Sequence, residues 1–264
     1  MYLYQRGSIR QRPGHARPPP FQRSTGMDPA IAKGCIMTRY GVYFLPAADS
    51  ALWRFGCASI GYDSIVGAST PFHEHDFFRS DSIRVWTSDP RRYGFHATLK
   101  PPFELLAGHS PERLDAIAAA FADGQCAFTV DRLVVQPISG FLALVPTSQK
   151  TELTTLANAC VRTFEHIRGP LKASDRERRL KAPLSDRQLA YLDRWGYPYV
   201  FDEFRFHMTL TGRLPDDVVR TATSAFSELY KAADHPVKID SICICEQPNR
   251  EGQFRLRRRY PFRG

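Results

Sequence analysis

The 264-residue chain lacks the short motifs of several large enzyme classes. It has no GxxxxGK[ST] phosphate loop, no GxGxxG dinucleotide turn, no GxSxG nucleophile elbow and no HExxH metal motif. It also has no stretch that approaches the roughly 18 apolar residues of a membrane span. The sequence therefore disfavours a P-loop enzyme, a dinucleotide-dependent enzyme and a membrane protein, and we predict a location in the cytoplasm.

The six cysteines show neither a CxxC pair nor the spacing of a disulfide framework. Cys243 and Cys245 alternate along a predicted strand, so both point to one face. Small buried side chains in a reducing compartment are the favoured interpretation. The His-Glu-His-Asp segment at 73–76 has a His-x-His spacing suited to a metal. Its irregular surroundings favour a surface loop, with a substrate loop as the alternative, and we expect neither a metal nor another cofactor.

The formal net charge of +9 is concentrated at the two ends of the chain. Residues 1–36 carry six basic residues against one acidic residue, and residues 250–264 have the same balance. The middle of the chain therefore sums to −1, and the basicity argues only weakly for a nucleic-acid-binding face. Arg255, Arg257 and Arg259 alternate on a predicted strand, where they form either a charged edge or a basic wall that guides an anionic substrate.

The first 36 residues are rich in arginine, proline and glycine and lack the apolar run of a signal peptide. We predict a disordered basic leader over 1–36 and a bilobal catalytic domain over 37–264. Met37 directly precedes the first strand-like run, which indicates that translation starts at Met27 or Met37 and that the leader is dispensable.

The order of the predicted elements indicates an internal duplication. A strand, a helix and a strand pair are predicted over 94–145, and the same order recurs over 203–260. We therefore predict an α+β fold of two pseudo-symmetric lobes. Each lobe is expected to be an antiparallel sheet packed on helices, and a central cleft is expected to carry one His-x-Thr motif per lobe. The segments 61–92 and 171–187 are predicted to be irregular. The remaining predictions are a strand over 40–45 and helices over 48–58, 110–124, 153–167, 185–195 and 215–233.

Each predicted copy begins with a strand that carries a His-x-Thr motif, His96-Ala97-Thr98 and His207-Met208-Thr209. Side chains alternate across a strand, so each histidine and its threonine point to the same polar face. Phenylalanine precedes and leucine follows both motifs, and two such patterns on matching strands are far beyond chance. A single motif is typical of an ordinary strand histidine, whereas the pair indicates a site.

The longer stretches Tyr93–Phe103 (YGFHATLKPPF) and Phe204–Gly212 (FRFHMTLTG) resemble the paired signatures of the two-histidine (2H) phosphoesterase superfamily. More narrowly, they resemble the branch encoded in bacterial phosphonate-utilisation (C–P lyase) operons. The resemblance covers about residues 38–262 and implies two sheet-and-helix lobes with a metal-independent activity on cyclic phosphodiesters. It also implies that the two histidines are an acid–base pair and that Thr98 and Thr209 hold phosphoryl oxygens.

Two histidines that titrate near neutrality suit this reaction, because one can take a proton from water while the other gives one to the leaving oxygen. Which histidine is the base stays open at this stage. Lys100 shares the predicted face of Thr98 and is either a phosphate ligand or a lysine in solvent. Tyr93, Arg205 and Arg213 are further substrate-binding candidates, with a carboxylate partner as the alternative for Arg205.

The leading hypothesis is a phosphoric diester hydrolase that opens a ribose cyclic phosphate in phosphonate metabolism. An RNA 2′,3′-cyclic phosphodiesterase or 2′–5′ RNA ligase is the alternative within the class. A non-catalytic binder of a phosphorylated ligand or RNA is the alternative outside it. The expected partner is thus a small phosphorylated sugar, a nucleotide or an RNA end, while the direction of reaction and the oligomeric state stay open.

Overall fold

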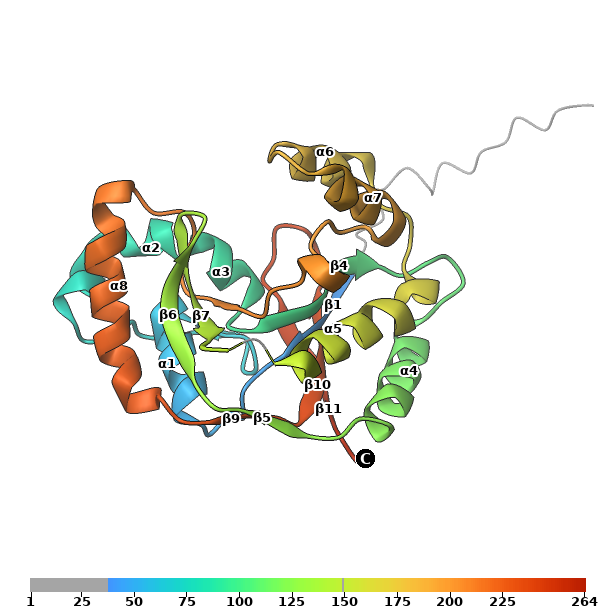
Figure 1. Ribbon diagram of the computed structural model, residues 1–264, viewed down its shortest axis with the longest axis horizontal. Coiled ribbons are helices and arrows are strands. Elements are labelled where there is room, and N and C mark those ends of the chain that lie inside the picture. The colour runs from blue at the N-terminus through green and yellow to red at the C-terminus, as the bar shows by residue number, and fades with distance from the viewer. Residues whose placement is uncertain (1–37, 149) are drawn as a thin grey trace, which may run out of the picture. The chain divides into compact units, whose positions relative to one another are not determined.

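The computed structural model describes residues 38–148 and 150–264, and in them seven antiparallel strands form one sheet (Figure 1). The predicted leader over 1–36 lies outside these residues. The sheet order is β11-β10-β1-β4-β8-β7-β6. Its strands are β1 (Arg39–Phe44), β4 (Ala97–Glu104), β6 (Leu133–Ile138), β7 (Phe141–Pro146), β8 (Met208–Thr209), β10 (Ser241–Gln247) and β11 (Arg255–Pro261). Two further pairs are β2 (Tyr62–Asp63) with β3 (Ala68–Ser69), and β5 (Phe128–Val130) with β9 (Val237–Ile239).

Helices pack on this sheet and confirm the predicted α+β class. Helix α4 contacts β10 and β11, α5 contacts β4, and α8 contacts β6 and β7. No helix within the described ranges is long and apolar enough to cross a membrane. The α-helices are α1 (Ala51–Ile60), α2 (Ile83–Trp86), α3 (Ser88–Tyr93), α4 (Pro111–Asp123), α5 (Thr151–Thr163), α6 (Ala173–Leu180), α7 (Asp186–Trp195) and α8 (Asp216–Tyr230). Short 3₁₀ helices are η2 (Asp76–Arg79), η3 (Glu165–Ile167), η4 (Phe201–Glu203) and η5 (Lys231–Ala233).

The predicted duplication is confirmed by the order of the elements. The first copy runs β4-α4-β5-β6-β7 and the second runs β8-α8-β9-β10-β11. Equivalent strands pair with each other, β4 with β8 and β5 with β9. The copies also exchange partners: β7 of the first lies beside β8 of the second, and α4 of the first packs on β10 and β11 of the second. The two copies therefore share one continuous sheet, in which the pairing of β4 with β8 joins them.

Helix caps occur where the sequence predicts them. The Ser110 hydroxyl accepts a hydrogen bond from the Arg113 backbone at the start of α4, Pro111 takes the first helical position, and Gly124 follows the last turn. Ser185 and Gln188 form a capping box at the start of α7. Gly196 ends that helix at φ 73°, a left-handed conformation that glycine adopts without strain.

Several predicted boundaries are wrong. The strand predicted at the start of the second copy is reduced to β8, and η4 lies ahead of it. The strand predicted from 127 to 136 is divided into β5 and β6. The segments predicted to be irregular contain short elements, β2, β3, η2, α2 and α3 in 61–92 and α6 in 171–187. Charged composition alone does not distinguish a solvated helix such as α6 from a loop.

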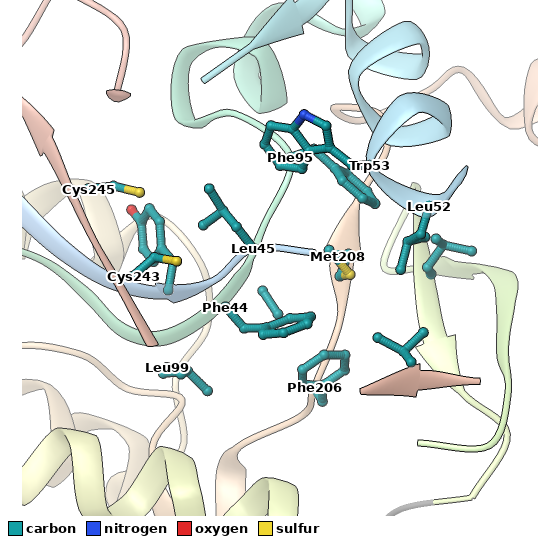
Figure 2. Close-up of a cluster of buried hydrophobic side chains, with 14 of the residues drawn as sticks. Phe44, Leu45, Leu52, Trp53, Phe95, Leu99, Phe206, Met208, Cys243 and Cys245 are labelled. Carbon is teal, nitrogen blue, oxygen red and sulfur yellow. The ribbon is translucent and has the colours of Figure 1, made fainter. Parts of the chain in front are cut away.

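The apolar faces of the two motif strands meet in the core (Figure 2). Phe95, Leu99, Phe206 and Met208 are all at most 2% exposed. Cys243 and Cys245 are also buried in this cluster, which agrees with their interpretation as small buried side chains. The core therefore fixes which face of each motif strand remains available for polar side chains.

Candidate active site

The two histidines are held by the same local geometry. His96 Nδ1 lies 2.8 Å from the Gly94 carbonyl oxygen, and His207 Nδ1 lies 2.8 Å from the Arg205 carbonyl oxygen. A carbonyl oxygen can only accept a hydrogen bond, so Nδ1 carries the hydrogen in both rings. In the neutral imidazole, Nε2 is then the nitrogen that can accept a proton, and in His96 it accepts a hydrogen bond from the Thr98 hydroxyl.

The register of β4 and β8 brings the two motifs together. Ala97 pairs with Met208 in an antiparallel ladder. The same register places His96 opposite Thr209 and Thr98 opposite His207, all on the face turned away from the core. The Thr98 hydroxyl lies 3.0 Å from His96 Nε2. The four motif side chains are half-buried, in contrast to the fully buried Ala97 and Met208 between them.

Both imidazoles favour the neutral form in the free protein. Desolvation lowers the pKa of His96 to about 4, the hydrogen bond to Gly94 opposes this shift, and the nearby charge of His207 adds to it. Desolvation also lowers the pKa of His207, against the hydrogen bond to Arg205. Each ring is therefore ready to accept a proton at neutral pH, and a bound anion is needed to favour a protonated ring.

Tyr43 lies beneath His96 and is a site residue that sequence reasoning missed. The two rings stack with centroids 3.9 Å apart and an interplanar angle of 27°. Tyr43 is fully buried, and its hydroxyl has no hydrogen-bond partner among the described residues. Gly41 makes room for it, because a Cβ at that position would lie 2.5 Å from the Tyr43 ring. The Tyr43 ring therefore fixes the plane of the His96 imidazole.

A cleft of about 410 Å³ opens beside Thr98 and His207. Its volume is within the range of small-molecule sites. One wall consists of Ile138 and Phe141 at the β6–β7 hairpin, and a second consists of Ala157, Asn158 and Val161 on α5. The segment after α7 supplies most of the aromatic lining, namely Tyr197, Tyr199, Phe201 and Phe204.

A few polar groups interrupt this apolar lining. Asn158 Oδ1 is buried without a hydrogen-bond partner among the described residues. Gln188 donates to the Glu203 carboxylate at 2.9 Å. Arg205 is exposed, lines the cleft, and forms no ion pair with any described residue. These groups offer one free acceptor, one carboxylate and one free guanidinium to a polar ligand.

The other substrate-binding candidates lie at different distances from this cleft. The Tyr93 ring is 6.4 Å from the His96 ring and stacks on Phe254. Arg213 is exposed and lies over the β6–β7 turn at Gly140, outside the lining of the cleft.

Lys100 does not lie where strand alternation predicts. The register of β1 against β4 shifts between the pairs Val42–Lys100 and Tyr43–Thr98, so β4 has a bulge at Leu99. Lys100 is buried against α5 and η3, where its ammonium contacts Glu165 at 2.9 Å and the Val161 carbonyl at 3.1 Å. This position gives Lys100 a structural role and does not support a phosphate contact.

The remaining polar clusters of the sequence have structural partners. His73 Nε2 contacts the Ser59 hydroxyl and the Phe55 carbonyl, and His75 Nδ1 accepts from the Phe77 backbone at the start of η2. No group of three or more metal-ligating side chains occurs in the described part of the chain.

The arginines of β11 are also held by neighbouring groups. Arg257 pairs with Asp115 and Glu246, while Arg259 donates to the carbonyl oxygens of Leu45 and Pro46. Strand β11 is the edge of the sheet. Arg257 and Arg259 are therefore held by neighbouring groups, whereas Arg255 is exposed on the same strand.

Comparison with known proteins places the chain in a family by sequence. Residues 98–255 match the family model described as "Protein of unknown function (DUF1045)". The chain is 37% identical over 235 residues to ribose 1,5-bisphosphate phosphokinase PhnN of Janthinobacterium sp. (strain Marseille), covering 86% of the chain and 51% of that protein. The identity to the protein of the same name from Laribacter hongkongensis (strain HLHK9) is 31% over 219 residues, covering 83% and 50%. The chain thus spans about half the length of these curated relatives.

Among solved structures, that of E. coli LigT complexed with ATP matches 87% of this chain and 100% of LigT, with a TM-score of 0.40 and 10% identity. The predicted resemblance to the 2H phosphoesterases rests on the two His-x-Thr motifs and not on this match. At this TM-score and identity, no part of the chemistry depends on the likeness, and the chemical argument comes from the site alone.

Proposed function

The chain belongs to the DUF1045 family, and we propose that it is a phosphoesterase that opens a cyclic phosphodiester with two histidines. The observation that carries this proposal is the register of β4 and β8. It supports a site in which two imidazoles and two hydroxyls surround one space, with His96 opposite Thr209 and His207 opposite Thr98. A phosphoryl group in that space meets a proton acceptor, a proton donor and two hydroxyls.

We assign His96 as the general base. Its Nε2 takes a proton from water, whose oxygen attacks phosphorus on the side opposite the leaving ring oxygen. The pKa of about 4 keeps His96 neutral at physiological pH, as a base requires. Tyr43 and the Gly94 carbonyl hold the ring in one orientation throughout.

We assign His207 as the general acid. The anionic phosphodiester offsets the desolvation that lowers the pKa of His207, so the ring binds a proton when substrate is present. The bond from phosphorus to one ring oxygen breaks, and that oxygen leaves as a hydroxyl with the proton from Nε2. Thr98 and Thr209 donate to the non-bridging oxygens and stabilise their charge. The products are a phosphomonoester and a free hydroxyl.

The curated relatives suggest a ribose substrate. Their printed name is that of a ribose 1,5-bisphosphate phosphokinase, and this chain matches only about half of each. This chain also has no GxxxxGK[ST] phosphate loop. We therefore propose that the kinase activity belongs to the other half of those proteins. Opening 5-phosphoribose 1,2-cyclic phosphate at the bond to the C2 oxygen would yield ribose 1,5-bisphosphate, the compound that the kinase name contains.

A second candidate is a 2′,3′-cyclic nucleotide or a cyclic-phosphate RNA end. The aromatic lining and the volume of about 410 Å³ favour it, because a nucleobase can stack on Tyr197, Tyr199, Phe201 or Phe204. A ribose phosphate alone leaves part of that surface uncovered.

A panel of cyclic phosphodiesters tests the proposal. Wild-type protein, assayed with a chelator present, is expected to open 5-phosphoribose 1,2-cyclic phosphate, with 2′,3′-cyclic nucleotides and cyclic-phosphate RNA ends as the competing substrates. Preference for either nucleotide substrate would select the second candidate. No turnover of any member of the panel, or turnover abolished by the chelator, would contradict the mechanism.

A further inference from the structure

Arg179 is a half-buried guanidinium that forms no ion pair with a described residue, although the Asp175 carboxylate and the Tyr197 side chain interact with it electrostatically. It lies on α6, and burial lowers its pKa. Its Nε atom is buried and has no hydrogen-bond partner among the described residues, and those residues provide no ion pair for it. Its neighbours on α6 differ, since Arg176 pairs with Asp193 at 2.8 Å and Arg178 pairs with Asp175 at 2.9 Å. A guanidinium taken out of water usually has a carboxylate or phosphate partner.

The Arg179 side chain borders the active site. Its Cζ lies 4.3 Å from the centroid of the Tyr197 ring, which lines the cleft. The guanidinium also interacts electrostatically with Tyr93, whose ring is 6.4 Å from the His96 ring. Arg179 thus contacts one aromatic residue of the cleft wall and interacts electrostatically with a second aromatic residue near the proposed catalytic base.

The helix pair α6–α7 brings this residue to the cleft from outside the repeated units. The ion pair of Arg176 with Asp193 joins the two helices, which lie together at the top of the view in Figure 1. Arg250 anchors α6 to the sheet, because its guanidinium contacts both Asp175 and Glu104. Ion pairs therefore connect α6 both to α7 and to the sheet, and they hold Arg179 in position.

A second buried cation increases the positive potential nearby. Arg39 on β1 is 6% exposed and donates to the Gln247 side-chain oxygen at 2.8 Å. It also forms no ion pair with a described residue, and its guanidinium lies over the Phe254 ring that stacks on Tyr93. Arg39 thus contacts the Tyr93–Phe254 stack, and Arg179 interacts electrostatically with the Tyr93 ring of the same stack.

We propose that Arg179 forms a subsite for a second phosphate of the substrate, separate from the cyclic phosphate between the two histidines. This inference rests on the proposed function and assigns the residue that would bind the terminal phosphomonoester of the proposed sugar substrate. The planar guanidinium suits bidentate contact with a phosphate. The adjacent Tyr93 and Tyr197 hydroxyls are further donors to the same group.

Titration calorimetry with ribose 5-phosphate tests the subsite without any catalytic step. Wild-type protein is expected to bind this probe, and Arg179→Gln is expected to bind it about 10–100-fold more weakly, because it lacks a charge-assisted contact. Arg178→Gln on the same helix is the matched control, with affinity within about twofold of wild type. Arg179→Lys retains the charge without the planar fork and is expected to recover part of the affinity.

Kinetics with two substrates complete the test. Arg179→Gln should raise KM for 5-phosphoribose 1,2-cyclic phosphate about tenfold or more and leave KM for ribose 1,2-cyclic phosphate unchanged. Equal affinity of wild type and Arg179→Gln for ribose 5-phosphate would overturn the subsite. An equal rise of KM for both cyclic substrates, with an unchanged melting temperature, would also overturn it. Turnover of neither substrate by wild type would contradict the proposed function, while calorimetry would still decide the role of Arg179.

Discussion

The buried contact between Lys100 and Glu165 predicts an asymmetric response to mutation. The Lys100 side chain is 1% exposed and that of Glu165 is 16% exposed, with the ammonium 2.9 Å from the carboxylate. Burial lowers the pKa of Lys100, and the charge of Glu165 opposes that shift. Glu165 has a second partner, because Arg168 contacts it at 2.7 Å. Replacing Glu165 therefore leaves Lys100 without its counter-charge, whereas replacing Lys100 leaves Glu165 paired with Arg168.

Glu165→Gln leaves the buried ammonium without its counter-charge. Breaking a buried pair in this way costs about 3–5 kcal/mol of unfolding free energy. Lys100→Met removes the charge that needs compensation and leaves Glu165 paired with Arg168, so its expected cost is about 1 kcal/mol or less. Urea denaturation of both variants measures this difference directly.

The same two variants decide the role of Lys100 in the reaction. Its ammonium is engaged by Glu165 and by the Val161 carbonyl, so Lys100→Met should keep kcat/KM within about threefold of wild type. A stable Lys100→Met protein that loses activity about 100-fold would place Lys100 at the phosphate and refute the structural role. Equal stability of the two variants would refute the reasoning from the buried charge.

Three further predictions concern the support of His96 and the titration of the pair. Gly94→Ala should lower the free energy of unfolding by about 3 kcal/mol, because φ is 75° and the new Cβ would lie 2.5 Å from the Ser64 side chain. The same change should lower activity at least tenfold, because the Gly94 carbonyl orients the His96 ring. Gly108→Ala is the control, because Gly108 has a similar φ of 87° but open space around it. It should lose only about 1 kcal/mol of unfolding free energy and no activity. Similar losses in the Gly94 and Gly108 variants would contradict the role given to Gly94. Tyr43→Phe should leave kcat unchanged, because the lost hydroxyl has no hydrogen-bond partner among the described residues. Tyr43→Leu should lower kcat about tenfold, because it removes the ring that stacks on His96. Equal kcat for both variants would argue against a role of the Tyr43 ring in positioning His96. Finally, the pH dependence of kcat/KM reports the ionisation of the free protein. In the free protein the pKa of His96 is about 4 and that of His207 lies below its ordinary value of 6.5. Because His207 must carry a proton to act as the acid, kcat/KM should fall as the pH rises above about 6.5. A kcat/KM that increases from about pH 6.5 to 8 would contradict a mechanism in which one of the two rings must carry a proton.

Strand alternation predicted which residues around the two motifs enter the core, although His96 and His207 each lie one residue before the strands β4 and β8. Phe95, Ala97, Phe206 and Met208 are buried, which fixes the opposite face of each strand. The same rule fails two residues later at Lys100, because a bulge at Leu99 changes the alternation. Nothing in the local sequence marks that bulge, which arises from the pairing of β4 with β1.

The residues that sequence reasoning missed reach the site through contacts distant in the chain. Tyr43 lies beside β4 only because β1 is inserted between β10 and β4. Arg179 belongs to the charged run Arg176-Glu177-Arg178-Arg179, in which the sequence gives no reason to separate one arginine from the others. Only the packing of α6 over Tyr197 distinguishes the unpaired cation from its solvated neighbours.

Turnover of 5-phosphoribose 1,2-cyclic phosphate by His96→Ala and His207→Ala tests the central claim most directly. Each variant should lose about 10²–10⁴-fold in kcat, because each histidine transfers a proton in the transition state. The double variant should lose little more than either single variant, since the two rings act as one unit. Wild-type kcat in either stable single variant would contradict the two-histidine mechanism.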